Sequence, residues 1–334
     1  MNIAASGRLG AKLAFAAFSL MLLWAAHPAV AQGWPKQPVR LVVPYPAGSG
    51  AGDIMARRLA EKLAEKWKQP VIVDNQPGAA EIIAATRVAR SSPDGYTLFL
   101  ATEGALQTNP FLFSKLPYDP TKDFTPITRV AEGGFMYVVR KDSPFQTMQQ
   151  LVAAAKAQPG KVSYGSGGAG GTAHLAVNWF ATMAGNLQFL HVPYKGAAAR
   201  VQDVLAGNLD FTAAPVAAVS AFVKDGRMRP LATSGARRLR ALPDVPTLAE
   251  LGYKDPVVTF MFALVGPSKM PPDLTNMIAR DVAALLKDPD FVAQNMDPFG
   301  LVAIGDTPLE FARFLAADRD KQRARVKAAN VQLD

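Results

Sequence analysis

The chain has 334 residues and no cysteine, and its formal net charge is +9. The length is enough for two domains, each with its own core, although one long domain is an alternative. The lack of cysteine excludes a disulfide framework and a thiolate metal site, so stability must come from packing. A positive charge suits an anionic ligand, but the basic residues are scattered along predicted helices. Since neither a helix-turn-helix nor a zinc-finger spacing is present, we expect no nucleic-acid partner.

Residues 1–31 have the pattern of a cleavable export signal. Arg8 and Lys12 precede an apolar stretch from Leu13 to Ala26, and Ala29-Val30-Ala31 offers small residues to a signal peptidase. The apolar stretch is shorter than the roughly 20 residues of a comfortable bilayer span, and no later segment is long and apolar enough. We therefore expect a periplasmic protein that is soluble after cleavage. An uncleaved signal that tethers the chain to the membrane is the alternative.

Short β-branched or aromatic runs alternate with helical patterns along the rest of the chain. This alternation predicts an α/β fold. Six runs predict strands: Val39 to Tyr45, Val71 to Asp74, Tyr96 to Leu100, Phe135 to Val139, Leu187 to Val192, and Thr259 to Val265.

Helices are indicated by their periodicity and their ends. Between the first two strand runs, apolar residues recur every four positions and predict an amphipathic helix, at Met55, Leu59, Leu63 and Trp67. Thr307-Pro308-Leu309-Glu310 combines an N-cap, a first-turn proline and a capping-box glutamate. Gly207 and Gly226 follow two other predicted helices.

Two glycine-rich loops, Pro44 to Asp53 and Ser163 to His174, each follow a predicted strand and open a helix. Glycines let a ligand approach the backbone closely, and the free amides and dipole of a helix N-terminus form an anion site, for which a carboxylate is a natural guest. Alternatively, the loops only permit tight reversals, with Asp53 and Thr172 as N-caps. Because the loops fall in different predicted domains, we favour a cleft closed by both.

A dinucleotide site is the first alternative, because Gly165 to Gly170 spells G-x-G-x-x-G between a strand and a helix. That motif expects an acid about 20 residues later to bind the ribose, and positions 184 to 194 contain none. In the first loop, Asp53 takes the place of the third glycine and would repel pyrophosphate. The pattern therefore disfavours a nucleotide cofactor.

Catalytic and metal sites are weakly supported. No G-x-S-x-G is present, and His174 and His191 are the only histidines after the predicted signal. A triad is left open, but His174 falls in a first helical turn and His191 in a strand. The acids have no calcium-loop spacing. We expect no metal, no cofactor and no enzymatic activity.

Taken together, these residues resemble the Bug-type extracytoplasmic receptors, the substrate-binding components of tripartite tricarboxylate transporters. The resemblance covers essentially the whole chain after the signal. It runs through Trp34-Pro35, Pro38 to Pro44, Asn75 to Ala79, Pro93 to Thr97, Leu116 to Pro120, Tyr164 to Ser166, His174-Leu175, His191 to Gly196 and Leu242 to Thr247.

The resemblance implies a bilobed type II periplasmic-binding-protein fold that closes on its ligand like a Venus flytrap. Residues 32–128 and 244–334 would form the first domain, residues 129–243 the second, and two crossing segments the hinge. It also implies a monomer that binds a di- or tricarboxylate, an aromatic acid or a related organic acid and delivers it to the membrane permease subunits. A sensor for a membrane kinase and a periplasmic enzyme acting on carboxylates are the alternatives.

In that family, backbone amides of both loops hold a carboxylate. The implied ligand-binding residues are Tyr45, Pro46, Ala47, Gly48, Asp53, Thr102, Ala105, Ser166, Gly170, Gly171, Thr172, His174 and Tyr194. For Tyr194 and Lys195, a role as turn anchors is an equal alternative.

The sequence departs from the family pattern at two places. The first loop is one residue longer than usual, with Gly52 where a threonine commonly precedes the aspartate. Asp53 would then either contact a ligand amine or only cap its helix. Ala80-Glu81-Ile82-Ile83 replaces the usual glycine-rich continuation after Pro77-Gly78-Ala79, a change whose consequence the sequence does not give.

Overall fold

The computed structural model describes residues 33–48, 50–194 and 196–333. The predicted export signal and Lys195 lie outside these ranges. Gln37–Asp334 form one compact unit, separate from the residues before it. Within the described ranges, every helix is too short or too polar to span a bilayer.

In the first part of the sheet, three parallel strands are followed by three strands that each run antiparallel to the strand before. In spatial order they are β2 (Val71–Asn75), β1 (Val39–Val43), β3 (Thr97–Ala101), β9 (Thr259–Pro267), β4 (Phe124–Arg140) and β10 (Leu301–Ala303). The accompanying helical elements are α2 (Gly50–Trp67), η1 (Ala79–Glu81), α3 (Ile82–Ala89), η2 (Gly104–Thr108), α4 (Asn109–Leu112), α9 (Pro272–Leu286), α10 (Pro289–Asn295) and η3 (Asp297–Phe299). As predicted, α2 buries Met55, Leu59, Leu63 and Trp67.

The second part of the sheet is built on the end of β4. Both β7 (Phe211–Pro215) and β8 (Met228–Thr233) pair with it, and β5 (Ser163–Ser166) and β6 (Leu190–Pro193) follow β7 in parallel. The helices are α5 (Met148–Ala157), α6 (Thr172–Met183), α7 (Ala197–Ala206) and α8 (Val216–Lys224). The largest buried side chains of this part are the aromatic rings of Tyr137, Tyr164, Phe180 and Phe211.

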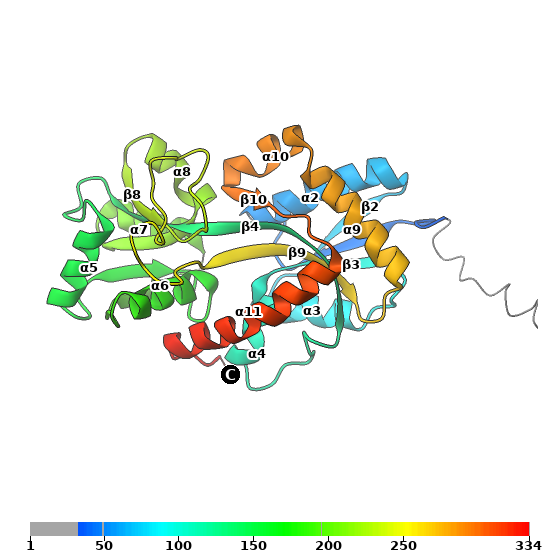
Figure 1. Cartoon of the computed structure of the whole chain (residues 1–334), viewed down its shortest axis with the longest axis horizontal. Helices are drawn as coiled ribbons and strands as arrows, with labels where there is room; N and C mark the ends of the chain where they lie inside the picture. Colours follow the sequence, from blue (N-terminus) through cyan, green and yellow to red (C-terminus); the bar gives the residue numbers. More distant parts are fainter. Residues whose placement is uncertain (1–32, 49, 195, 334) are drawn as a thin grey trace, which may run out of the picture. The chain divides into compact units, whose positions relative to one another are not determined.

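β4 belongs to both parts of the sheet, and Figure 1 shows it with β9 as two long strands through the middle of the fold. It pairs with β9 as far as Gly134 and with β7 from Phe135. The chain returns beside this point, because the Ser234 hydroxyl accepts from the Phe135 amide at 2.9 Å and donates to the Val258 carbonyl at 2.6 Å. A Cβ on Gly134 would lie 2.6 Å from the Gly235 nitrogen, so β4 and the segment after β8 are in close contact at this point.

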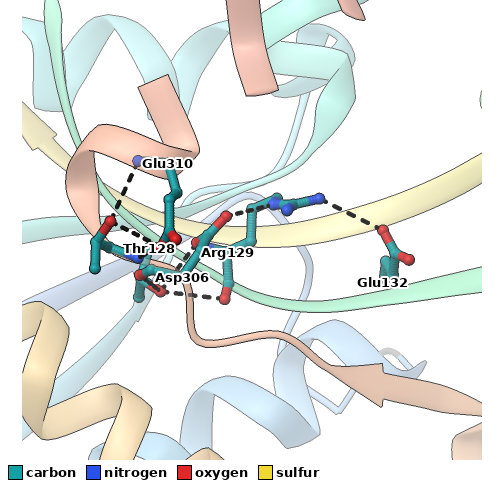
Figure 2. Close-up of polar contacts among 6 residues, drawn as sticks. Thr128, Arg129, Glu132, Asp306 and Glu310 are labelled. Atoms are coloured by element: carbon teal, nitrogen blue, oxygen red, sulfur yellow. Dashed lines mark hydrogen bonds and ion pairs between the residues drawn. The ribbon is translucent and has the colours of Figure 1, made fainter. Parts of the chain in front are cut away.

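The start of α11 (Pro308–Ala329) is fastened to the middle of β4. The predicted capping box is confirmed, since Thr307 and Glu310 bond each other's backbone amides. Just before it, Asp306 accepts from the backbone amide and from Nε of Arg129, both at 2.7 Å (Figure 2). Arg129 also lies 3.7 Å from Glu132 on the same strand.

The mixed α/β fold predicted from sequence is confirmed, and the strand predictions are confirmed in part. β1, β2, β3 and β9 lie within two residues of their predicted limits at either end. The run Phe135 to Val139 covers only the end of β4, and the run Leu187 to Val192 overlaps β6 but begins three residues too early. β5, β7, β8 and β10 were not predicted.

Candidate ligand-binding cleft

A cavity of about 710 Å³ lies between the two parts of the sheet. Its walls come from both glycine-rich loops, from η1, from the segment after β3, and from β9. The two loops, well separated along the chain, therefore meet at one cavity.

The first turns of four helices contribute to the walls, namely those of α2, α6, α7 and α8, with Gly50, Thr172, Ala197 and Ala217 as examples. A helix N-terminus carries about half a positive charge and unpaired amides. Four such ends around one cavity favour a negatively charged ligand.

In the second loop, Gly170, Gly171 and Thr172 line the cleft, whereas Ser166 and His174 are buried behind them. The Ser166 hydroxyl donates to the Gly168 carbonyl at 3.0 Å and accepts from its amide at 3.1 Å. The Gly170 amide donates to Nδ1 of His174 at 3.2 Å. Ser166 and His174 thus hold the loop in shape from behind.

His174 is held in its neutral form. Burial, with a smaller contribution from the neighbouring ring of His191, lowers its pKa to about 4. The two rings lie 4.1 Å apart between centroids, and Nε2 of His191 is 2.7 Å from the Ser166 hydroxyl. Neutral His174 can accept the Gly170 hydrogen bond, which a protonated ring cannot.

Tyr194 does not line the cleft. Its backbone amide donates to the Ser166 carbonyl at 3.0 Å, and its hydroxyl donates to Asp203 one turn before the end of α7. Through these contacts, Tyr194 anchors the turn between β6 and α7.

In the first loop, Tyr45 lines the cleft and Pro46, Ala47 and Gly48 do not. The reason for Gly52 is now visible, because a Cβ there would lie 2.5 Å from the ring of Tyr45. The tyrosine ring thus occupies the space next to the first turn of α2.

Asp53 is buried and fully engaged by the protein. It accepts from the Gly48 amide at 2.8 Å, from Arg57 Nε at 2.9 Å and from Asn75 at 2.7 Å. Burial alone would raise its pKa, but these hydrogen bonds and the Arg57 charge lower it overall. Asp53 closes the first loop onto α2 and lies away from the cleft wall.

Of the two residues predicted after β3, Thr102 lines the cleft and Ala105 is wholly buried. The Thr102 hydroxyl lies 2.7 Å from both carboxyl oxygens of Glu81. The next residue, Glu103, lines the cleft as well.

Glu81 and Glu103 were not predicted as site residues. Glu103 accepts from the Thr172 hydroxyl and, at 2.9 Å, from the Met261 amide, and burial raises its pKa. Burial, with a smaller contribution from Glu103, raises the pKa of Glu81 to about 8 despite the hydrogen bond from Thr102. The only signal in the sequence was the departure from glycine at Ala80-Glu81.

Aromatic rings form a further part of the wall. Phe135, Phe260 and Phe262 all line the cleft, and their rings contact in series at centroid distances of 5.4 and 5.8 Å. Tyr45 contacts Phe262 edge-on at 6.3 Å. Among the described residues, no three His, Asp or Glu side chains are grouped so that they could hold a metal ion.

This chain is similar to a known protein family and to several known sequences. Residues 55–331 match the model described as tripartite tricarboxylate transporter family receptor. The UPF0065 protein in the gbd 5' region of Cupriavidus necator is 36% identical over 94% of both chains. Protein BugT of Bordetella pertussis is 30% identical over 92% of this chain and 94% of its own.

Several solved structures of other proteins are similar to this structure over most of its length. A structure described as a periplasmic transporter is 33% identical with a TM-score of 0.77, covering 90% of this chain and all of the other. Rpa4515 of R. palustris, solved with adipate, is 31% identical with a TM-score of 0.79 and covers 90% of this chain and 99% of its own. The periplasmic binding protein BugD is 29% identical with a TM-score of 0.75, covering 90% and 99%.

Proposed function

The chain belongs to the tripartite tricarboxylate transporter receptor family, and on that premise we propose that it captures a small carboxylate in the cleft and delivers it to a tripartite tricarboxylate-type permease. The observation that carries the proposal is the meeting of the two glycine-rich loops, with four helix N-termini, at one cavity. The export pattern of residues 1–31 agrees with a periplasmic place of action.

The energetics of such a site are adequate. A charge-assisted hydrogen bond contributes roughly 1.5 to 3 kcal/mol, so three or four of them, with some burial, reach micromolar affinity or about −8 kcal/mol. The first-turn amides of α6, those of Thr172 and Ala173, lie at the wall of the cleft for this. The reported adipate complex of Rpa4515 makes adipate the first acid to test.

Closure would use the two crossing segments as its pivot. We place the pivot at Gly134 and Thr259, where β4 and β9 pair at the passage from one part of the sheet to the other. The second domain expected from sequence, residues 129–243, would then begin later and end later, in keeping with the packing of Leu248 and Val258 in the core of the second part. Ligand contacts from both lobes then favour the closed state, which the permease distinguishes by shape.

A thermal-shift screen against mono-, di- and tricarboxylates, adipate included, tests the proposal. A ligand at 100 times its dissociation constant stabilises the native state by about 2.7 kcal/mol, a visible rise in melting temperature. The methyl ester of a hit should give no rise, because it lacks the negative charge. No response to any acid, in a folded sample free of retained ligand, would overturn the proposal.

Delivery needs a separate measurement in cells. Deleting the gene should abolish uptake of the acid that the purified protein binds, and a copy with unaltered sequence should restore it. Normal uptake in the deletion strain, together with a lost transcriptional response to the same acid, would favour the sensor alternative.

A further inference from the structure

One wall of the cleft comes from the second part of the sheet and its helices. Among the described residues, this wall has no charged side chain of its own, since its lining consists of glycines, alanines, Phe135, Thr172 and Pro215. A positive charge that attracts an acid to this wall must therefore come from helix N-termini or from a group behind the lining residues. Arg200 is such a group.

Arg200 lies in the first turn of α7, directly behind this wall, and is 3% exposed. A Cβ on Gly167, which lines the cleft, would lie 3.5 Å from Nη1 of Arg200. Ala197, one turn earlier on the same helix, lines the cleft as well. Because Gly167 has no side chain, the guanidinium can approach the wall closely at this point.

The protein does not balance the charge of Arg200. Its Nε is buried and has no hydrogen-bond partner among the described residues. Burial is the only cause that lowers its pKa, to about 10, so no neighbouring carboxylate of the described chain holds the charge. Asp203, one turn later on α7, accepts instead from Tyr194 and Asn208. At neutral pH the side chain is therefore a buried cation without a counter-ion from the described chain.

A guanidinium in this position lowers stability for two reasons. Taking a charged group out of water is costly unless an opposite charge compensates for it. The positive end of the α7 dipole adds repulsion, because Arg200 lies in the first turn of that helix. An anion at Gly167 and Ala197 would offset both costs, since Arg200 and the unpaired amides of the first turn would attract it together.

We propose that Arg200 and the first turn of α7 form a second anion subsite of the cleft, at Gly167 and Ala197, separate from the site at the start of α6. This inference rests on the receptor function proposed above. The first carboxylate of a ligand lies at α6, and a second acid group lies in front of Arg200. Arg200 is then a positioning residue that acts through the wall at Gly167 and selects acids with two anionic groups.

The test uses acids of equal chain length that differ by one carboxylate. Calorimetric titration of the protein expressed from the full-length sequence would compare succinate with butanoate, glutarate with pentanoate, and adipate with hexanoate. In at least one pair, the doubly charged acid should bind at least about tenfold more tightly, the size expected for one charge-assisted contact. That preference is the quantity to follow in variants.

Arg200→Met removes the charge and should reduce the preference to less than about threefold, by weakening only the doubly charged acid. Arg200→Lys keeps the charge and should retain more of the preference than Arg200→Met. Arg58→Met, at an exposed arginine of α2 that pairs with Glu61, is the matched control and should leave the preference unchanged.

The melting temperature without ligand separates this role from a structural one. Arg200→Met replaces a buried, unbalanced charge by an apolar side chain, so it should melt at least about 2 °C above wild type. An arginine that is needed for packing would instead lower the melting temperature when it is replaced. A variant that melts below wild type therefore overturns the assignment, even if the preference is lost.

A free inorganic anion has the same chemistry as an acid group of the ligand. Thermal-shift measurements with sodium chloride and with sodium phosphate, in the absence of any organic acid, distinguish the two sources. We expect the same shift for wild type and Arg200→Met. If either salt stabilises wild type more than Arg200→Met, the subsite holds a free anion, and the selection of a second acid group is wrong.

The outcomes separate the two proposals. Equal or tighter binding of the singly charged acids, or a preference that survives Arg200→Met, overturns the inference and leaves the receptor function standing. If no acid of either series binds the folded wild-type protein, the receptor proposal fails and the inference fails with it.

Discussion

The Thr172 hydroxyl donates to Oε1 of Glu103, and this contact joins the second glycine-rich loop to the segment after β3 across the cleft. Glu103 is 4% exposed, so bulk water does not reach it to replace that donor. The contact is therefore a direct link between the two walls.

Thr172→Val should destabilise the protein by about 1 to 3 kcal/mol, because it keeps the side-chain shape and leaves a buried acceptor unpaired. Thr172→Ser retains the hydroxyl, so its loss of unfolding free energy should be less than half that of Thr172→Val. Urea unfolding of the two variants measures the difference. If Val and Ser cost the same, the hydrogen bond is not the source of the effect.

Glu81 should make stability fall as pH rises. Its pKa in the folded protein, about 8, lies above the ordinary value, so its stabilising share is complete at acidic pH and is lost as pH rises to 8. The titratable groups that face it are Glu103, Tyr45 and Tyr118, and both tyrosines stay protonated because burial raises their pKa. Relative to wild type, Glu81→Gln should gain at least about 2 °C in melting temperature between pH 5 and pH 8. If the melting temperatures of the two proteins change equally with pH, this prediction is wrong.

His174 should have the opposite dependence. Its folded-state pKa of about 4 lies below the ordinary value, so its stabilising share is complete above about pH 6.5 and is lost as pH falls toward 4. The unfolding free energy of wild type should drop by up to about 1.4 kcal/mol per pH unit more than that of His174→Gln. Denaturant titrations at pH 7, 6 and 5 check the slope. In His191→Gln, the unfolding free energy should still fall with decreasing pH nearly as steeply as in wild type, because His174 is unchanged.

The close contact between Gly134 on β4 and Gly235 after β8 can be tested from both sides. Gly134→Ala places a Cβ 2.6 Å from the Gly235 nitrogen and 2.9 Å from its Cα, and backbone atoms cannot yield as a flexible side chain does. We expect a loss of about 1 to 3 kcal/mol. Gly235→Ala meets nothing nearer than 3.5 Å and should cost less than about 1 kcal/mol. Equal losses in chemical denaturation would show that the close approach is unimportant.

The parts of the fold with strong local patterns were predictable. The four-residue period of α2 and the capping box of α11 are local features, and both were confirmed. β5 and β7 were missed because their sequences, Ser163–Ser166 and Phe211–Pro215, contain few β-branched residues. Small residues are needed there, since a Cβ on Gly165 would lie 2.9 Å from Cβ of Arg200.

The cleft was only partly predictable. Glycine-rich loops at helix starts are visible in a sequence, and they led to Gly170, Gly171 and Thr172, which line the cavity. Whether a nearby polar residue faces the cavity or braces the loop depends on partners far along the chain, as Asp53 with Asn75 demonstrates. Glu81 was missed because its entry into the cleft depends on an unusual backbone rather than on a motif.

Ala79, Ala80 and Glu81 all have positive φ, at 45°, 49° and 73°, a conformation that costs a residue other than glycine about 1 to 2 kcal/mol. Glycine at the last position would relieve part of this cost and the cost of burying a carboxyl. The protein is thus less stable at Glu81 than its backbone allows. Selection for thermal stability alone would therefore favour glycine at position 81, so a glutamate there is kept at a cost in stability.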